Sequence, residues 1–361
     1  CIMYSEPSLQ FSSADEASFK DFDLMLFDKV IAFDNLKQKI FVIANVKTDN
    51  IEQGYQKAYE EIGKITETIK SHISKTTLPL TLKTQLKAKD TKEGFIGIVN
   101  RAKQYIKDGD IFQAVLSRRF TAKAVGSLFN TYRVLRTVNP SPYMFFIKTD
   151  DVEIAGASPE TLIKSNGGKL FTFPIAGTRK RGETDTEDTE FETELLQDEK
   201  ELSEHNMLVD LGRNDVGKIS KFGSVRVEEY ARILRFSHVM HIASTVTGEI
   251  SEGKDCIDAV SALLPAGTLS GAPKIRACQI IDELETSRRG IYGGAIGYID
   301  FSGNMDMCIG IRIAIKKADT LYIQAGAGIV ADSIPESEYN ECANKAAAML
   351  RAVELSGKEL E

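Results

Sequence analysis

The spacing of hydrophobic and polar positions separates a loosely patterned N-terminal part from a tightly patterned remainder. Residues 1–26 are acidic and show no clear period. Two β-rich runs, at 29–33 and 39–46, predict a hairpin. Residues 51–73 repeat apolar side chains at helical spacing, whereas 71–90 are rich in Lys and Thr and lack a period. We therefore expect a helix followed by a linker or exposed loop that ends near residue 90.

From residue 91 onward the apolar periods are short and well bounded. Helices are predicted at 95–107, 127–136, 188–209, 256–263, 273–285 and 336–355. Strands are predicted at 112–120, 143–147, 152–156, 170–173, 292–299, 307–315 and 321–326. The last helix opens with Ser333-Ile334-Pro335-Glu336, which predicts a capping box with Pro just inside the helix start. Several strands follow one another directly, so the order favours an α+β (mixed α/β) fold with sizeable sheets over a doubly wound parallel sheet.

Composition narrows the class of protein. The chain has 361 residues, 42% hydrophobic and 27% charged, which is typical of a globular enzyme of one large or two ordinary domains. The net charge of −7 predicts no nucleic-acid partner, and no apolar run is long enough to span a membrane. The start at Cys1 lacks a signal-peptide pattern, so we expect a fragment cut from a longer chain. Five scattered cysteines predict reduced thiols in a cytoplasmic protein: Cys1, Cys256, Cys278, Cys308 and Cys342.

Two Glu-x-x-Glu pairs are the first candidate for chemistry. Glu201 and Glu204 lie in one predicted helix and Glu338 and Glu341 in another, and a spacing of three places each pair on one helical face. If the faces met, like charges ~4 Å apart would repel by about 4 kcal/mol at an effective dielectric of ~20. An all-oxygen set without a cluster of His or Cys suits Mg²⁺. On spacing alone, two solvated acidic helix faces remain the more common arrangement.

Four other places carry candidate binding or proton-transfer groups. Small residues around Gly326 and Gly328 would let backbone N–H groups approach an anion, although a tight turn explains them equally well. A third glycine is missing, so a small carboxylate fits better than a nucleotide. Arg312 lies in an apolar strand and needs a carboxylate, from a substrate or from a structural salt bridge. His241 lies within a predicted strand, where histidines are commonly structural. Glu160 follows the end of a strand, and its position alone does not indicate a function.

These segments together resemble the chorismate-utilising enzymes, most closely the large subunits of anthranilate synthases. The resemblance runs from about residue 95 to residue 355, and its motifs are GDIFQAVLSRRF, NPSPYMFF, ASPETL, FPIAGTRKRG, ELSEHNMLVDLGRND, SHVMH, LLPAGTLSGAPK, IYGGAIGY, CIGIRIAI and GAGIVADSIPESEYNECANKAA. It implies two large, mainly antiparallel sheets packed as a sandwich with surrounding helices. It also implies a chorismate-binding catalytic domain over 91–361, preceded over 1–90 by a remnant of a regulatory region and a linker.

The resemblance assigns the acidic pairs to a Mg²⁺ site at the ring carboxylate of chorismate. Glu204 and Glu341 would bind the ion, and Glu201 and Glu338 would hold its waters. Three further groups would contact that end of the substrate: Gly326, Gly328 and Lys345.

The same resemblance assigns the remaining candidates to the other parts of chorismate. Arg312 and Tyr292 would hold the enolpyruvyl carboxylate, and Thr268 would line the ring pocket. Glu160 would act as general acid for the C4 hydroxyl, a role that needs a raised pKa. His241 would serve the proton chemistry at C2.

Two residues, Gln113 and Ala176, bear on the reaction type. Gln113 stands where isochorismate and salicylate synthases have a water-activating Lys, and Ala176 stands where aminodeoxychorismate synthases typically have Lys. Thr178 supplies a hydroxyl donor in the same loop as Ala176. The resemblance therefore implies attack of ammonia at C2, giving anthranilate and pyruvate, the first committed step of tryptophan biosynthesis. An aminodeoxychorismate or aminodeoxyisochorismate synthase is the alternative enzyme, and a non-catalytic, tryptophan-responsive binding subunit is the alternative of another class.

Partners and regulation follow from the same resemblance. Ammonia would come from a glutamine amidotransferase subunit, because none of the cysteines lies in a G-x-C-x-G elbow. Tryptophan would inhibit the full-length protein at a site of which this chain retains one half and lacks the L-L-E-S segment. The retained half is Asn139, Pro140, Ser141, Pro142, Tyr143 and Met144. We expect intact catalytic residues beside a broken regulatory pocket.

Overall fold

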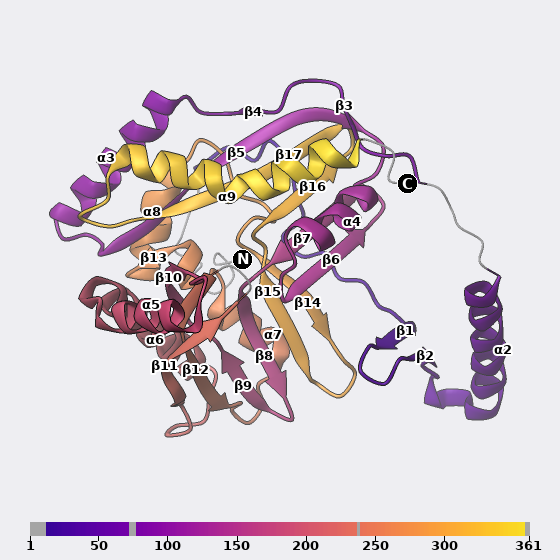
Figure 1. Ribbon diagram of the computed structural model, residues 1–361. Coiled ribbons are helices and arrows are strands. Elements are labelled where there is room, and N and C mark those ends of the chain that lie inside the picture. Colours follow the sequence, from indigo (N-terminus) through magenta and orange to yellow (C-terminus); the bar gives the residue numbers. More distant parts are fainter. Residues whose placement is uncertain (1–11, 72–76, 237–238, 358–361) are drawn as a thin grey trace. The chain divides into compact units, whose positions relative to one another are not determined.

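The chain forms two compact units in the computed structural model, which describes residues 12–71, 77–236 and 239–357 (Figure 1). Residues 20–77 make up a small unit, and residues 1–19 with 78–361 make up a large one. Among the described residues, no helix has the length and apolar character needed to cross a membrane.

The small unit is a hairpin followed by a helix, as the apolar pattern predicts. Strands β1 (Lys29–Asp34) and β2 (Lys39–Ala44) pair antiparallel, and η1 (Thr48–Asn50) leads into α2 (Ile51–Lys70). The Asn50 side chain caps α2 by accepting a hydrogen bond from the backbone of Gln53.

The first sheet of the large unit has eight strands in the order β13-β5-β17-β16-β7-β6, with β3 and β4 also paired to β5. Its strands are β3 (Thr81–Leu82), β4 (Lys87–Ala88), β5 (Gln113–Val125), β6 (Tyr143–Lys148), β7 (Val152–Ser158), β13 (Gly271–Ala272), β16 (Ile313–Lys317) and β17 (Thr320–Ile329). Its helices are α3 (Lys92–Lys107), α4 (Phe129–Val138), α8 (Lys274–Leu284) and α9 (Pro335–Ser356). Every pairing in this sheet is antiparallel, and α9 packs along β17 beside α3 and α4 (Figure 1).

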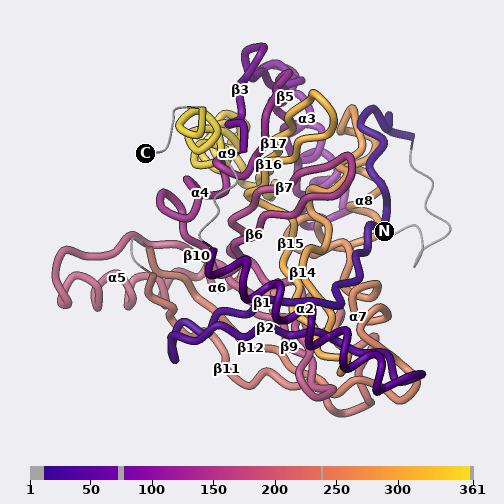
Figure 2. Tube along the Cα trace, turned by 90° about the vertical axis from the view of Figure 1, so that its right-hand side faces the viewer, coloured from indigo at the N-terminus to yellow at the C-terminus, as the bar shows by residue number. Residues whose placement is uncertain are grey.

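The second sheet has seven strands in the order β10-β12-β9-β8-β15-β14, with β11 paired to β12, and is also antiparallel. Its strands are β8 (Thr161–Asn166), β9 (Lys169–Thr172), β10 (Ile175–Lys180), β11 (Arg226–Arg235), β12 (Val239–Glu249), β14 (Ala295–Ile299) and β15 (Met305–Ile309). Its helices are α5 (Asp185–Gln197), α6 (Glu199–Gly217), α7 (Cys256–Leu263) and the short η2 (Gly267–Leu269). Figures 1 and 2 show β5, β16 and β17 at one end of the large unit and β9, β11 and β12 at the other.

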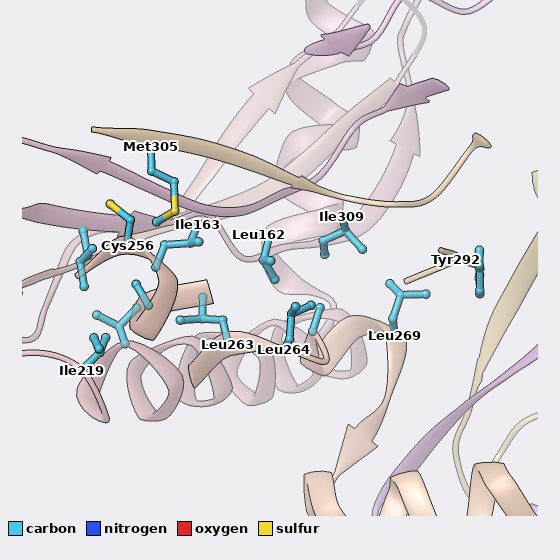
Figure 3. Packing of buried hydrophobic residues seen from close by; sticks show 14 of the residues in the cluster. Leu162, Ile163, Ile219, Cys256, Leu263, Leu264, Leu269, Tyr292, Met305 and Ile309 are labelled. Carbon is cyan, nitrogen blue, oxygen red and sulfur yellow. The ribbon is translucent and has the colours of Figure 1, made fainter. Parts of the chain in front are cut away.

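Apolar side chains join the sheets to each other and to their helices. Ile154 and Ile313 of the first sheet share a buried cluster with Ile296 and Cys308 of the second. A larger cluster joins the second sheet to α7 and the loop after it, and Figure 3 shows Leu162, Ile163 and Ile309 facing Leu263, Leu264 and Leu269. Each fully buried Leu or Ile stabilises the fold by roughly 1.5–3 kcal/mol. The prediction of a mixed α/β fold with two large antiparallel sheets is confirmed.

Two predicted elements are interrupted where a polar group or a change of sheet intervenes. The helix predicted at 188–209 is two helices, because Asp198 is extended and its carboxylate caps α6 through the backbone N–H groups of Lys200 and Glu201. The strand predicted at 307–315 leaves the second sheet as β15 and enters the first as β16. Arg312, at the crossing, has a φ of 52°.

Smaller corrections concern element ends. The predicted capping box is wrong: Ile334 occupies the N-cap without a side-chain hydrogen bond, and the Ser333 hydroxyl accepts from the Val330 N–H instead. The segment predicted as a linker or exposed loop at 71–90 contains β3 and β4, and Leu80 within it is 1% exposed. Tyr292 precedes β14 in a turn and is not part of the strand.

Candidate active site

A cavity of about 690 Å³ lies where the two sheets and helices α6 and α9 meet. Its walls come from β5, β10, β12, η2, β17 and the turn before β14 as well as from both helices. Every residue predicted for catalysis, substrate binding or metal binding lines it: Gln113, Glu160, Ala176, Thr178, Glu201, Glu204, His241, Thr268, Tyr292, Arg312, Gly326, Gly328, Glu338, Glu341 and Lys345. Residues more than 230 positions apart in the sequence therefore share one site.

The acidic wall of the cavity joins two helices. Glu201 and Glu204 project from α6, and Glu338 and Glu341 project from α9. Burial raises the pKa of Glu204, and the charges of Glu201 and Glu341 raise it further. Burial also raises the pKa of Glu338, to which the charge of Glu341 adds. The carboxylates of the two helices thus lie within electrostatic reach of each other, which is the crowding that the spacing predicts.

Two cationic side chains relieve part of this charge. Lys345 Nζ lies 2.5 Å from Glu341 Oε1, and Arg179 Nη1 lies 3.5 Å from Glu201 Oε1. Across residues 12–71, 77–236 and 239–357, no three His, Cys, Asp or Glu side chains are arranged closely enough to hold a metal ion. The donor set still fits a hard divalent cation, because it consists of carboxylate oxygens, and burial with neighbouring negative charge raises the pKa of two of them, Glu204 and Glu338.

Arg312 contributes a positive charge to the same cavity. Its Nη1 donates to the Lys345 carbonyl at 2.9 Å, and the ion pairs of the described residues do not include it. Arg312 lines the cavity, and no carboxylate of the described residues forms an ion pair with it, which is the arrangement that an anionic ligand completes. Tyr292 is 5% exposed, and burial raises the pKa of its phenol, so it remains a neutral donor. A Cβ atom at Gly326 would stand 2.9 Å from the Tyr292 hydroxyl and 2.9 Å from the Leu116 carbonyl oxygen, so this position accepts only glycine without displacement.

Glu160 and Thr268 form another part of the wall. Burial raises the pKa of Glu160, while the Thr268 side chain and the charge of Lys345 act in the opposite direction without offsetting the burial. Thr268 Oγ1 is buried and lies close enough to Glu160 to lower the pKa of that carboxyl, but it makes no hydrogen bond of ordinary geometry within the described residues, so it can turn toward a ligand. Both residues also border a second, smaller cavity of about 50 Å³.

His241 lies on β12 with its ring held from one side. Its Nδ1 is 2.8 Å from the Gly177 carbonyl oxygen and 3.1 Å from Thr178 Oγ1. A carbonyl oxygen only accepts, so Nδ1 carries the hydrogen and Nε2 of the neutral ring is left to accept a proton. His238, the other histidine of the same motif, lies outside the described residues.

The two positions that bear on the reaction type face the same cavity. Gln113 on β5 is 6% exposed, and a Cβ atom at Gly328 would stand 2.7 Å from its Nε2. Ala176 on β10 is 9% exposed and pairs with Ile242. Neither position carries an amine.

The cavity also contains residues that the sequence did not single out. Lys200, Gln324, Asp332 and Ser337 line it. Gln324 has a detectable signal, since it is a polar residue inside the apolar run of β17, the same argument that identifies Arg312. The other three are polar residues in or beside helices and carry no such signal.

The predicted tryptophan half-site lies elsewhere. None of residues 139–144 lines the cavity. Tyr143 on β6 is fixed by its hydroxyl, which lies 2.8 Å from both Asp306 Oδ1 and Thr161 Oγ1. Met144 packs against the cluster that contains Leu135 and Met349.

The chain is similar to a known family and to several proteins of that family. The family model described as chorismate binding enzyme matches residues 2–351. The chain is 51% identical to the anthranilate synthase component 1 of Acetivibrio thermocellus over 95% of the chain and 71% of that protein. It is 48% identical to the corresponding protein of Aquifex aeolicus over 100% of the chain and 74% of that protein. The crystal structure of anthranilate synthase component I from Streptococcus pneumoniae superposes with a TM-score of 0.85 at 41% identity, covering 96% of this chain and 78% of that one.

Proposed function

This chain belongs to the family of chorismate binding enzymes, and from that membership we propose that it is the large subunit of an anthranilate synthase. As such it is a lyase that converts chorismate and ammonia to anthranilate and pyruvate, at the start of tryptophan biosynthesis. One observation supports this most strongly. Two acidic pairs, an arginine without a carboxylate partner and a carboxyl with a raised pKa all line one cavity.

Chorismate carries two carboxylates, and the cavity offers a binding group for each. At one end, Arg312 and the Tyr292 hydroxyl would hold the enolpyruvyl carboxylate, because both are donors without an anionic partner. At the other end, the backbone of Gly326 and Gly328 and the ammonium of Lys345 would contact the ring carboxylate. Thr268 Oγ1 would donate to or accept from the ring between these ends.

Chorismate-utilising enzymes generally depend on Mg²⁺, and the acidic wall supplies the ligands that this ion prefers. Glu204 and Glu341 would bind it, with Glu201 and Glu338 holding its waters. When bound, the ion stabilises the negative charge of the ring carboxylate and orients the ring. Lys345 would then exchange its contact with Glu341 for one with the substrate.

The first step joins nitrogen to C2 and removes oxygen from C4. As the ammonia lone pair forms the C2–N bond, the ring double bonds shift and the C4–O bond breaks. Protonated Glu160 donates its proton to that oxygen, which leaves as water, and the new ammonium group releases a proton to solvent. Burial suits Glu160 to this task because it keeps the carboxyl protonated at a higher pH than in water.

The second step makes the ring aromatic. His241 Nε2 takes the proton from C2, the C–H electron pair enters the ring, and the C3–O bond to the enolpyruvyl group breaks. Pyruvate leaves as its enolate and takes up a proton. The contact of His241 Nδ1 with the Gly177 carbonyl leaves Nε2 as the basic nitrogen for this step.

Gln113 and Ala176 support ammonia as the nucleophile. Neither provides an amine that could deprotonate water or attack the ring itself. We propose that a glutamine amidotransferase subunit supplies the ammonia, which the name of the relatives, component 1, supports because it implies a partner component.

We also propose a regulatory role for two segments outside the catalytic cavity, residues 139–144 and residues 1–90. Residues 139–144 would form half of a tryptophan site in the full-length protein, and residues 1–90 would be a regulatory remnant and linker before the catalytic residues 91–361. The position of 139–144 away from the cavity supports inhibition at a separate site. The four described cysteines are buried and free, which supports a cytoplasmic location.

Isotope labelling separates this reaction from its alternatives. The purified chain is incubated with chorismate, Mg²⁺ and ¹⁵N-ammonium, and the products are identified by mass spectrometry and NMR. We expect ¹⁵N attached to C2 of an aromatic product, with pyruvate released. Nitrogen at C4 would instead identify an aminodeoxychorismate synthase, and a nitrogen-free isochorismate would show that water is the nucleophile.

A further inference from the structure

Behind the cavity wall, Arg289 and Glu285 form a buried ion pair. Arg289 Nε lies 2.8 Å from Glu285 Oε2, and Nη2 lies 2.6 Å from Oε1. The side chains are 17% and 7% exposed. Glu285 Oε1 also accepts from the backbone N–H and the hydroxyl of Ser117, each at 2.8 Å. The charges are therefore paired, so Arg289 and Glu285 together add no net charge behind the cavity wall.

The other donors of Arg289 reach two separate segments of the wall. Nη1 donates to the Leu269 carbonyl at 2.5 Å, and Nη2 donates to the Val115 carbonyl at 2.6 Å. The guanidinium also lies 5.9 Å from the ring centroid of Tyr292. Val115, Leu269 and Tyr292 all line the cavity, whereas Arg289 does not.

These three contacts place Arg289 at the junction of the residues that would hold chorismate. Leu269 follows Thr268 in η2, and Val115 lies two residues after Gln113 on β5. Tyr292 ends the turn that Arg289 itself begins, with its backbone N–H 3.4 Å from the Arg289 carbonyl. The planar fork of a guanidinium makes these bonds in fixed directions, which a lysine ammonium cannot do.

We propose that Arg289 is a positioning residue for chorismate: it holds β5, the η2 turn and the Tyr292 turn in the one arrangement that binds the ring and the enolpyruvyl carboxylate. The inference rests on the proposed function and adds a residue to it that does not touch the substrate. It also predicts independence from the metal, because the hydrogen bonds that Arg289 makes among the described residues reach neither α6 nor α9, which carry the four glutamates.

The test compares Arg289→Lys with Arg288→Lys as a matched control. The Arg288 side chain is 42% exposed, and its ion-pair contact is Asp15 at 3.9 Å. For Arg289→Lys we expect kcat/KM for chorismate to fall roughly tenfold to hundredfold, because small displacements of positioning groups cost that much. The Mg²⁺ concentration for half-maximal activity should not change, and Arg288→Lys should match the wild type in both constants.

A second variant and a rescue keep the inference testable if Arg289→Lys folds poorly. Glu285→Asp retains the charge pair but draws the guanidinium away from the wall, so a similar fall in kcat/KM for chorismate is expected, with the Mg²⁺ concentration for half-maximal activity unchanged. Guanidinium ion at millimolar concentration should restore part of the activity of Arg289→Ala.

Three outcomes would overturn the inference: an unchanged kcat/KM in Arg289→Lys or Glu285→Asp, a half-maximal Mg²⁺ concentration that rises by the same factor as kcat/KM falls, or no rescue by guanidinium. Wild-type protein in the same assay tests the proposed function separately. If the wild type does not convert chorismate, the proposed function fails. If it does while Arg289→Lys equals it, only the role of Arg289 fails.

Discussion

Glu160 combines burial with a position on the cavity wall, and this combination gives its carboxyl a raised pKa. Sequence alone offers a carboxyl after a strand end, which is a common feature. The structure adds the physical cause, because a charged carboxylate loses hydration when it is buried. A general acid for the C4 hydroxyl needs this property.

Replacing Glu160 with Gln removes the proton donor and keeps the side-chain shape. We expect kcat to fall by about 10²–10⁴, the usual contribution of general acid catalysis. The wild-type kcat should decline as the pH rises through the raised pKa of Glu160, and the variant should lack this decline. Glu252→Gln, on an exposed residue, is the control and should leave the pH–rate profile unaltered.

The same substitution should alter stability with a defined sign. Because the folded-state pKa of Glu160 lies above its unfolded value, the folded protein binds this proton more tightly. Wild-type stability is therefore lost as the pH rises from the unfolded pKa through the folded pKa. Glu160→Gln should raise the melting temperature above that window relative to wild type, and the gain should vanish below it. A gain that grew toward acid pH would contradict the assigned shift.

The backbone of Gly326 lies close to the Tyr292 hydroxyl and to the Leu116 carbonyl oxygen. Gly326→Ala would place a Cβ atom 2.9 Å from the Tyr292 hydroxyl and from a backbone carbonyl that cannot move aside. We expect the KM for chorismate to rise about tenfold, equivalent to roughly 1.4 kcal/mol. Gly97→Ala is the matched control, because nothing lies within 4 Å of that Cβ on α3. Equal KM values for the two variants would show that the close approach has no role in binding.

The break between α5 and α6 shows how an element positions the acidic wall. The Asp198 carboxylate caps α6 at the turn that carries Glu201, and it accepts from Arg179 Nη2 at 2.8 Å. Arg179 in turn lies 3.5 Å from Glu201. Asp198 thus fixes both the start of α6 and the position of the Arg179 guanidinium beside Glu201.

Asp198→Ala should therefore weaken Mg²⁺ binding as well as the helix. We expect the half-saturating Mg²⁺ concentration to rise roughly tenfold or more, as for other outer partners of metal ligands. Thr184→Ala removes the corresponding cap of α5, whose hydroxyl accepts from the Glu187 N–H at 3.2 Å. That control should lose about 1 kcal/mol of stability, typical of an N-cap, with its Mg²⁺ dependence intact. If both variants show the Mg²⁺ dependence of the wild type, Asp198 does not position the glutamates of the acidic wall.

The sequence predicts elements well where one period persists and poorly where polar groups interrupt it. The hairpin at β1 and β2 and helices α3, α7 and α8 appear close to their predicted positions. The change of sheet between β15 and β16 could not be predicted, since both strands are apolar and buried and the pattern continues across Arg312. The break between α5 and α6 at Asp198 is not predicted, because the polar residues on both sides of it are compatible with one continuous helix.

At the scale of the whole molecule, the fold brings Gln113 of β5 and Lys345 of α9 to one cavity. The residue types and their motifs point to each member of the site in advance, through the family resemblance. Their convergence depends on the antiparallel order of β5 and β17 and on the packing of α9 along β17, which no local pattern encodes. The contacts of Arg289 likewise depend on three segments that meet only in the folded chain.

The decisive measurement follows chorismate, anthranilate fluorescence and pyruvate together in one reaction of the purified protein with ammonium and Mg²⁺. We predict that anthranilate and pyruvate appear in equal amounts as chorismate disappears, and that chelation of Mg²⁺ stops both. Chorismate that is not consumed, or that is consumed without release of both products, would contradict an anthranilate synthase site in this cavity.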